Sequence, residues 1–365
     1  MVVYAGMTII SSLFAFLSAK AGGLNAFGEK ISEPNREKQI VFAILSGLAV
    51  YLVMALRYDI GTDYSLIYVP RFYAFKNPDA VIKWEPVYWF MNKLFASIVD
   101  NPQVIFIVSS LLIVVPLWIT IFKMSSMPWL SVILFVIGRH FFISLNGVRQ
   151  YTAFAFIMLA FTFIPKRKFV PYALCIVFAT LCHYSVIVFL PMWVLIYLKI
   201  SPKQSMIFLG FSALITPYLR SFTRWLVSLT KYRYYFGTKY DLPDRYNEWT
   251  LLEQIFVFVI ILLIIEERRI QEDELPLRFL FNLNLVNVWF AFNINLIPLG
   301  ERMSWAFEFP TLLLLPLCIS RIRGKKKAWA LIICIIIVYL FIMYCRVVIM
   351  KDHRILPYQM FFGKF

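Results

Sequence analysis

The sequence predicts an all-α protein that crosses a membrane many times, and two observations support this: its composition and its runs of apolar residues. Hydrophobic types make up 61% of the 365 residues and charged types only 15%, whereas a soluble domain carries roughly 25% charged residues. The mean hydropathy is +0.75. This composition excludes a soluble globular protein, a disordered chain and a secreted disulfide scaffold.

Twelve apolar runs divide the chain. Crossing the hydrocarbon core takes about 20 helical residues, so the shorter runs must tilt little, extend into flanking residues or thin the bilayer. No linker, repeat or low-complexity tract interrupts them, and we expect a single integral-membrane domain over residues 1–365 with about 12 spans. No Lys or Arg precedes the first run, so we expect an uncleaved span there. The runs are roughly 3–19, 39–56, 103–122, 127–145, 149–164, 169–183, 185–198, 206–219, 251–265, 277–298, 303–319 and 328–349.

Residues 86–99 predict a helix that lies in the membrane interface rather than one that crosses. Pro86 suits a first helical turn, and the segment is amphipathic at helical spacing. Its apolar face carries Val87, Met91, Leu94, Phe95 and Ile98, and its polar face carries Asn92, Lys93 and Ser97.

Basic residues predict the orientation. The net charge is +16, which in a membrane protein indicates cytoplasmic anchoring and attraction to anionic lipid. Nucleic acid is not an expected partner, because no soluble basic domain exists to bind it. The compact clusters 166–168 and 321–327 are expected inside, since short loops dominate the positive-inside rule. Both termini and the long segments 57–102 and 220–250 are then expected outside.

Neither a metal nor a cofactor is expected. The five cysteines lie in apolar runs without a CxxC pair, and the three histidines lie far apart in the sequence. Known zinc sites need closer spacing. We interpret the cysteines as small core residues.

With this orientation, most of the unusual polar residues collect on the outer side, where ionisable groups at membrane depth usually serve function. Arginines there suit a lipid pyrophosphate, because guanidinium is always charged and binds phosphate bidentately. Arg149 opposes the dipole of the helix that it begins, so it is expected to face an anion or a carboxylate. Structural alternatives stay open. Arg57 could be an anchor at the membrane interface, and Arg302 could form a local ion pair with Glu301. The asparagines of 277–298 could hydrogen-bond neighbouring helices or line a sugar cavity; they include Asn284, Asn287 and Asn295.

Four outer motifs occur together in order. They are Arg57…Gly61-Thr62-Asp63-Tyr64…Tyr68, Glu85-Pro86, Asn146-Gly147-Val148-Arg149-Gln150 and His183-Tyr184-Ser185. In order and spacing this set resembles the EpsG-like family of bacterial exopolysaccharide and capsule proteins, which look like Wzy-type polysaccharide polymerases. The resemblance is good from about residue 40 to 200 and loose beyond, at Glu301-Arg302 and Pro357-Tyr358. It implies extension of glycans on undecaprenyl pyrophosphate at the outer face of a bacterial inner membrane, with a GT-C-like glycosyltransferase architecture.

The resulting hypothesis is a metal-independent membrane glycosyltransferase of the polymerase type. A base takes a proton from the acceptor hydroxyl, and cations stabilise the departing pyrophosphate. Asp63 is the first candidate for the base, because Gly61 permits a tight turn that projects it. Glu85 and His183 are the other candidates, although Glu85 could only start a helix and His183 could be a core histidine. Pyrophosphate is assigned to Arg57, Arg149 and Arg302, and the glycan to Tyr64, Tyr68, Asn146, Gln150 and Tyr184.

Two rival functions remain. A flippase or transporter for lipid-linked sugars would need charged residues near the bilayer midplane and a pseudo-symmetric repeat. A noncatalytic scaffold among other polysaccharide-synthesis proteins is the third possibility. The sequence leaves open the sugar, the linkage, the acceptor and whether the anomeric configuration is inverted or retained.

Overall fold

The structure is a computed structural model that describes residues 1–77, 79–229, 231–238, 241, 247–268, 274–296, 298 and 300–362. Over these residues it is all-helical, as predicted, with two isolated β-bridges that pair Leu24 with Lys30 and Arg57 with Met360. The chain forms two compact units. Unit 1 comprises Met1–Leu190 and Arg323–Phe365, and unit 2 comprises Pro191–Ile322.

Every predicted apolar run is helical, but fewer than twelve are long enough to cross a bilayer on their own. In the described residues, seven helices meet that length and hydropathy, and two bent helix pairs raise the number to nine. The other three runs form the shorter apolar helices Val148–Phe161, Phe169–Cys182 and Tyr184–Ile196. The chain is therefore a multi-pass membrane protein. The seven helices are Val2–Ala21, Arg36–Ala55, Gln103–Met124, Glu248–Ile265, Leu275–Phe292, Gly300–Ile319 and Lys325–Ile349.

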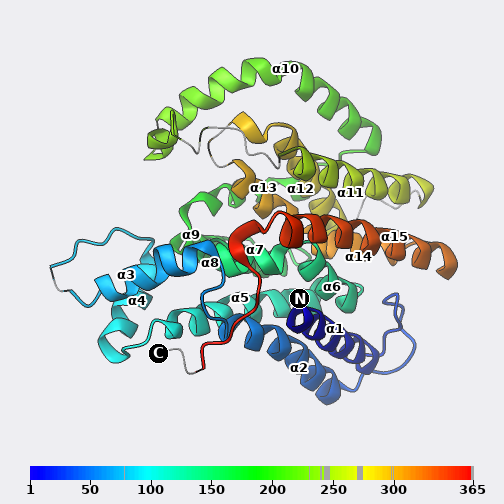
Figure 1. Ribbon diagram of the computed structural model, residues 1–365. Coiled ribbons are helices and arrows are strands. Elements are labelled where there is room, and N and C mark those ends of the chain that lie inside the picture. The colour runs from blue at the N-terminus through cyan, green and yellow to red at the C-terminus, as the bar shows by residue number, and fades with distance from the viewer. Residues whose placement is uncertain are drawn as a thin grey trace. The chain divides into compact units, whose positions relative to one another are not determined.

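Unit 1 begins with an antiparallel helix pair, which lies side by side in Figure 1: α1 (Val2–Ala21) and α2 (Arg36–Ala55). The side chain of Asn35 caps α2 by accepting a hydrogen bond from the backbone N–H of Lys38. Ser11 and Ser46 exchange hydrogen bonds across the pair, as small polar residues do between membrane helices. The pair packs further on α5 (Gln103–Met124) and α6 (Pro128–Ile137).

The centre of unit 1 is formed by α7 (His140–Asn146) and α8 (Val148–Phe161), in which nearly every residue is buried. Helix α8 packs between α5 and α9 (Phe169–Cys182). The single span predicted over 127–145 is broken instead, because Arg139 adopts a left-handed φ of 69° and α6 and α7 meet at a 55° bend. Left-handed backbone cannot continue a right-handed helix.

The helix predicted over 86–99 is present as α4 (Pro86–Ile98), but the expected orientation of one residue is wrong. Asn92, assigned to the polar outward face, is fully buried and donates a hydrogen bond to the carbonyl of Tyr88. Phe90, Leu94 and Ile98 are exposed. In a membrane the solvent is apolar, so a polar amide gains more from an internal partner than from facing outward.

One end of unit 1 holds basic connections between helices, and the other holds residues near the two chain termini. At one end, Lys325 lies 3.8 Å from Glu29, and the indole of Trp129 donates to the carbonyl of Ala26, so the basic connections meet there. At the other end, the hydroxyl of Tyr4 donates to the carbonyl of Ile355. Residues near the two termini therefore meet at one end of the unit.

We expect residue Ser65 to face the exterior, and Lys166 the cytoplasm. Both side chains are exposed, and the basic loops favour the cytoplasmic side. In a variant that lacks the five native cysteines, a single cysteine at Ser65 or Thr238 should react with a membrane-impermeant maleimide on intact cells. A cysteine at Lys166 should react only after lysis, and the reverse pattern would overturn the orientation.

The C-terminal segment of unit 1 follows α15 (Lys325–Met343), which packs on α6. A wide helical turn, η6 (Tyr344–Ile349), and a short turn, η7 (Asp352–Arg354), lead back to the first helices. The tail then pairs with the end of α2, where the N–H of Tyr58 donates to the carbonyl of Gln359 and that of Phe361 to the carbonyl of Leu56. The tail thereby encloses the chain that leaves α2.

Unit 2 contains η3 (Pro191–Ile196), α10 (Pro202–Ser228), η4 (Lys231–Tyr235), α11 (Asn247–Arg268), α12 (Leu275–Phe292), η5 (Ile294–Leu296), α13 (Gly300–Glu308) and α14 (Thr311–Ile319). Ser201 and Gln204 form a capping box that starts α10. The outer loop predicted from residue 220 is wrong at its start, because helix continues to Ser228. Within this segment Arg224 binds both carboxylate oxygens of Asp241 at 3.0 and 2.9 Å. The predicted loop positions Lys239, Tyr240, Asp244, Arg245 and Tyr246 lie outside the described residues.

Candidate functional site

The chain after α2 is held by capping of helix ends. The last carbonyls of a helix lack intrahelical partners, and here the amide of Gln103 donates to the carbonyls of Ala55 and Arg57 at 2.6 and 3.0 Å. The guanidinium of Arg57 donates to the carbonyl of Met54 and to that of Leu145, in the last turn of α7. Arg57 is 1% exposed. It therefore joins two negative helix ends, and its assignment to pyrophosphate stays a prediction.

The turn that carries Asp63 is fixed by Asn146. Gly61 has a φ of +94°, and a Cβ there would lie 2.8 Å from the carbonyl of Leu145, so the turn requires glycine. The side-chain oxygen of Asn146 accepts hydrogen bonds from the hydroxyl of Thr62 and the N–H of Asp63, both at 2.9 Å. Its amide nitrogen lies 3.2 Å from Nδ1 of His353. The predicted tight turn at Gly61 is confirmed.

The second group is an ion cluster built from three helix ends. Glu85 directly precedes α4, Arg149 lies in the first turn of α8, and His183 follows α9. One carboxylate oxygen of Glu85 pairs with Nη1 of Arg149, and the other lies 3.2 Å from Nδ1 of His183. The Glu85 side chain makes no capping hydrogen bond to α4. The expectation that Arg149 faces an anion or a carboxylate is confirmed, and Glu85 is that carboxylate.

Trp84 brings a second arginine to this cluster. The guanidinium carbon of Arg149 lies 5.2 Å from the centre of the Trp84 ring, and that of Arg71 lies 4.7 Å from it. Cation–π attraction holds both cations near one indole. The indole N–H of Trp84 and Nε of Arg149 are buried and have no hydrogen-bond partner within the described structure. Buried donors without partners are uncommon, and here they stand beside two positive charges.

The charges in this cluster do not cancel. Burial would raise the pKa of Glu85, but its hydrogen bond with His183 and the charge of Arg149 outweigh burial and lower that pKa to about 2. Burial and the nearby charge of Arg149 lower the pKa of Arg71, which shows that the two guanidinium groups repel each other. Among the residues of this cluster, one carboxylate therefore faces two arginines, and positive charge is in excess.

The remaining predicted residues fall into different surroundings. Tyr64 and Tyr68 are each 3% exposed. Tyr64 donates to Gln103 and stacks on Phe106 at 4.2 Å, and the Tyr68 hydroxyl accepts the backbone N–H of Arg149. Gln150 is buried in α8, and Tyr184 and Asp63 are partly exposed. Arg302 belongs to α13 of unit 2. Unit 1 thus assembles the predicted set from Arg57 to Tyr184, whereas the roles of its members stay predictions.

The sequence placed Arg71, Trp84 and His353 among the polar residues of the outer side but gave none of them a role in the site. Arg71 and Trp84 lie in the segment 57–102, which was expected outside. Their spacing in the sequence does not indicate that they would lie close to Arg149. His353 reaches Asn146 through a backbone with φ of 58°, between Lys351 and Arg354 at 55° and 53°. Successive left-handed residues other than glycine are costly and give no sequence signal.

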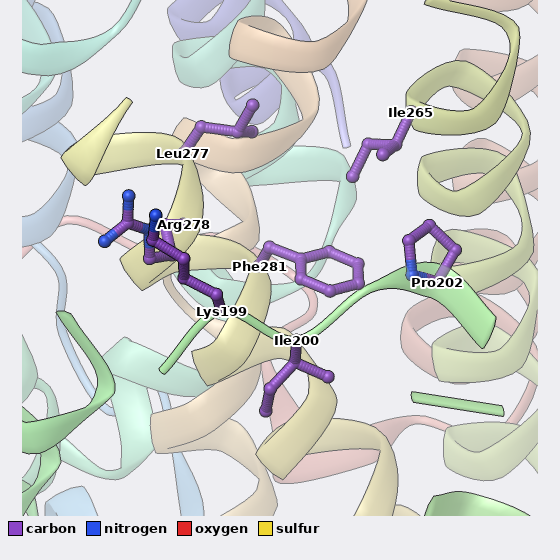
Figure 2. Close-up of a pocket in the computed structure, with 7 residues that line it drawn as sticks. All are labelled: Lys199, Ile200, Pro202, Ile265, Leu277, Arg278 and Phe281. Atoms are coloured by element: carbon purple, nitrogen blue, oxygen red, sulfur yellow. The ribbon is translucent and has the colours of Figure 1, made fainter. Parts of the chain in front are cut away.

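Unit 2 offers buried polar residues and a small cavity. Asn287 donates to Gln254 of α11 at 2.5 Å, which fits helix glue, whereas neither amide atom of Asn284 has a partner among the described residues. A cavity of 30 Å³ lies between the segment that follows η3 and helices α10, α11 and α12. Figure 2 shows Lys199 and Arg278 on one side of it and Phe281 and Pro202 on the other. A space of this size admits water molecules.

Replacement of Arg57 by alanine is expected to lower stability rather than ligand affinity. It leaves the carbonyls of Met54 and Leu145 buried without this donor, and each unsatisfied group costs about 1–3 kcal/mol. The melting temperature of the protein in detergent should fall clearly, while undecaprenyl pyrophosphate should bind the folded fraction as before. If the melting temperature were unchanged and binding were lost, Arg57 would instead be a residue that binds pyrophosphate.

Together, the fold and the cluster define a multi-pass helical membrane protein with a cationic site at one end of its helices. A family model matches residues 40–360, and the chain belongs to that family, the EpsG family. The match extends well beyond the part in which the motifs alone indicated it. The family associates the chain with exopolysaccharide biosynthesis. Neither the curated proteins nor the solved structures contain a significant match, and the GT-C-like architecture stays a prediction.

Proposed function

We propose that this EpsG-family protein is a membrane glycosyltransferase of the polymerase type. It joins oligosaccharide units carried on undecaprenyl pyrophosphate at the outer face of a bacterial inner membrane. The observation that carries the proposal is Glu85 held between Arg149 and His183, with Arg71 on the same indole as Arg149. Family membership and the position of this cluster at the helix ends support it.

The pyrophosphate of the donor binds at Arg71 and Arg149. Both guanidinium groups present several N–H donors, and phosphate oxygens accept them bidentately. The buried N–H of Trp84 adds a neutral donor. Because these groups are already fixed by stacking on Trp84, they need little reorganisation as negative charge develops on the leaving group, which is the condition for electrostatic catalysis.

His183 is the base in this proposal, in preference to Asp63 and Glu85. A carboxylate with a pKa of about 2 binds protons weakly, and both oxygens of Glu85 already face cationic or N–H groups. The ordinary pKa of histidine is closer to neutral than that of aspartate, and a base works best when its pKa lies near the working pH. Glu85 faces Nδ1 of His183, so it holds the imidazole with a proton on Nδ1 and a lone pair on Nε2.

The transfer then balances as follows. Nε2 of His183 takes the proton of the acceptor hydroxyl, and the acceptor oxygen forms a bond to the anomeric carbon of the donor. The bond between that carbon and the pyrophosphate oxygen breaks, and its electron pair stays on the pyrophosphate. Arg71 and Arg149 stabilise the released charge. The protonated imidazole is stabilised by Glu85 until its proton leaves.

A flippase is the second candidate, because Glu308 is 2% exposed inside the candidate span Gly300–Ile319. Charged residues within spans are typical of transport pathways. The outer-end cluster of unit 1 favours chemistry there, whereas Glu308 in unit 2 is the feature that would suit transport.

The decisive experiment reconstitutes the purified protein in liposomes with an undecaprenyl pyrophosphate-linked oligosaccharide. We expect a ladder of longer glycans on a gel, together with release of undecaprenyl pyrophosphate. Movement of labelled lipid between leaflets without any longer glycan would establish the flippase instead.

A further inference from the structure

An apolar groove in unit 1 starts beside the ion cluster. It lies between α4, α5 and α9 and has a volume of 380 Å³. This volume falls within the range of small-molecule sites, about 300–1,000 Å³. Every residue that lines it is apolar: Pro86, Val87, Phe90, Met91, Leu94 and Phe95 of α4, Val108 and Leu112 of α5, and Phe178 of α9.

Helix α4 has two different faces. The groove residues recur at helical spacing along one face of α4, over nearly its whole length. On the inner face, the hydroxyl of Tyr88 lies 2.8 Å from that of Thr152 and 3.1 Å from that of Ser109, and Asn92 is buried. Tyr88 and Asn92 are therefore internal, whereas Phe90 and Leu94 remain exposed along the groove.

The groove is continuous with the cationic site. Its first lining residue, Pro86, is bonded to Glu85, whose carboxylate pairs with Arg149. Phe178 lies five residues before His183 on α9, about 7.5 Å along the axis. A molecule that fits both the apolar groove and the cationic cluster has an anionic head and a long apolar tail. The positive charge beside Pro86 therefore favours an anionic lipid as the occupant of the groove.

We propose that this groove binds the first isoprene units of the polyprenyl chain of the pyrophosphate-linked substrate. The inference rests on the proposed binding of pyrophosphate at Arg71 and Arg149. The tail leaves the pyrophosphate past Pro86 and runs along α4 toward Leu94, while the glycan extends from the other side of the pyrophosphate. The groove thereby selects a lipid-linked donor over a soluble sugar nucleotide of the same charge.

The test compares two ligands of the same head group, undecaprenyl pyrophosphate and dimethylallyl pyrophosphate, on the purified full-length protein. Val108→Trp and Leu112→Trp fill the groove, and Val115→Trp is the matched control, since Val115 lies on the same helix but lines a different cavity. We expect Val108→Trp and Leu112→Trp to weaken undecaprenyl pyrophosphate binding about tenfold, the effect of losing about two buried methylene groups. Dimethylallyl pyrophosphate should bind all variants as it binds the wild type.

Equal weakening of both ligands, or of neither, would overturn the groove assignment. So would equal competition by an uncharged diacyl lipid, because the groove would then hold only bulk membrane lipid. These results are separable from the function itself. If Val108→Trp selectively weakens the long-chain ligand but no glycan ladder forms, the groove stands and the transferase proposal fails.

Discussion

Replacement of His183 by alanine should lower the rate of glycan transfer by about 10²–10⁴-fold, the usual contribution of a general base. Binding of undecaprenyl pyrophosphate should remain, because Arg71 and Arg149 stay in place on Trp84. The measurement pairs ladder formation with lipid binding on the same protein preparation. His183→Gln is a second variant that keeps a polar side chain of similar length and still lacks a proton acceptor of suitable pKa.

Asp63→Asn is the matched control for the base. The hydrogen bonds that fix this turn come from the backbone N–H of Asp63 and from Thr62 to Asn146, so asparagine should keep the turn. We expect it to retain most activity. Near-normal transfer in His183→Ala combined with complete loss in Asp63→Asn would move the base role to Asp63. Normal transfer in both would contradict a side-chain base at either position.

Loss of Arg149 should remove both catalysis and stability, and a second substitution should separate the two effects. Arg149→Gln leaves the carboxylate of Glu85 buried without its main partner, and breaking a buried pair in this way costs about 3–5 kcal/mol. Protein yield and melting temperature should fall. Transfer should fall about 10²–10³-fold per folded molecule, the loss typical of a donor that stabilises developing negative charge.

The double variant Arg149→Gln with Glu85→Gln is the control that separates these effects. It removes the unpaired charge, so yield and melting temperature should largely recover. Transfer should not recover, because the cation that faces the pyrophosphate is still absent and glutamine carries no charge to stabilise protonated His183. Arg149→Lys should keep much of the stability but little of the activity, since an ammonium lacks the bidentate fork. Recovery of transfer in the double variant would reduce Arg149 to a structural partner of Glu85.

The electrostatics of the cluster explain why Glu85, a candidate base from the sequence, is given a different role in the proposed mechanism. Glu85 and Asp63 are equivalent as acidic residues in a sequence. Only the packing of α4 against α9, and of the chain before α4 against the start of α8, gives Glu85 two partners and lowers its pKa to about 2. In the proposed mechanism Glu85 therefore orients His183 and does not act as the base.

The sequence by itself determined the features that depend on local composition. Apolar runs add up residue by residue, so the positions of the apolar helices followed from the chain, and so did the conclusion that it is a membrane protein. The need of Arg149 for a negative partner also followed, because the dipole of its own helix repels it. Gly61 is a third such case, since a tight turn with positive φ is a property of one residue.

Tertiary structure alone decided which polar residues meet. Glu85 and Arg149 are 64 positions apart, and their pairing depends on how three helices pack, which apolar patterning does not specify. Arg57 is buried, and its guanidinium bonds the end of its own helix at Met54 and a distant helix end at Leu145, a contact that the sequence could not predict. The faces of α4 were misjudged for the same reason. A polar side chain in a membrane protein turns toward whichever partner packing supplies, and that partner is not a local property of the sequence.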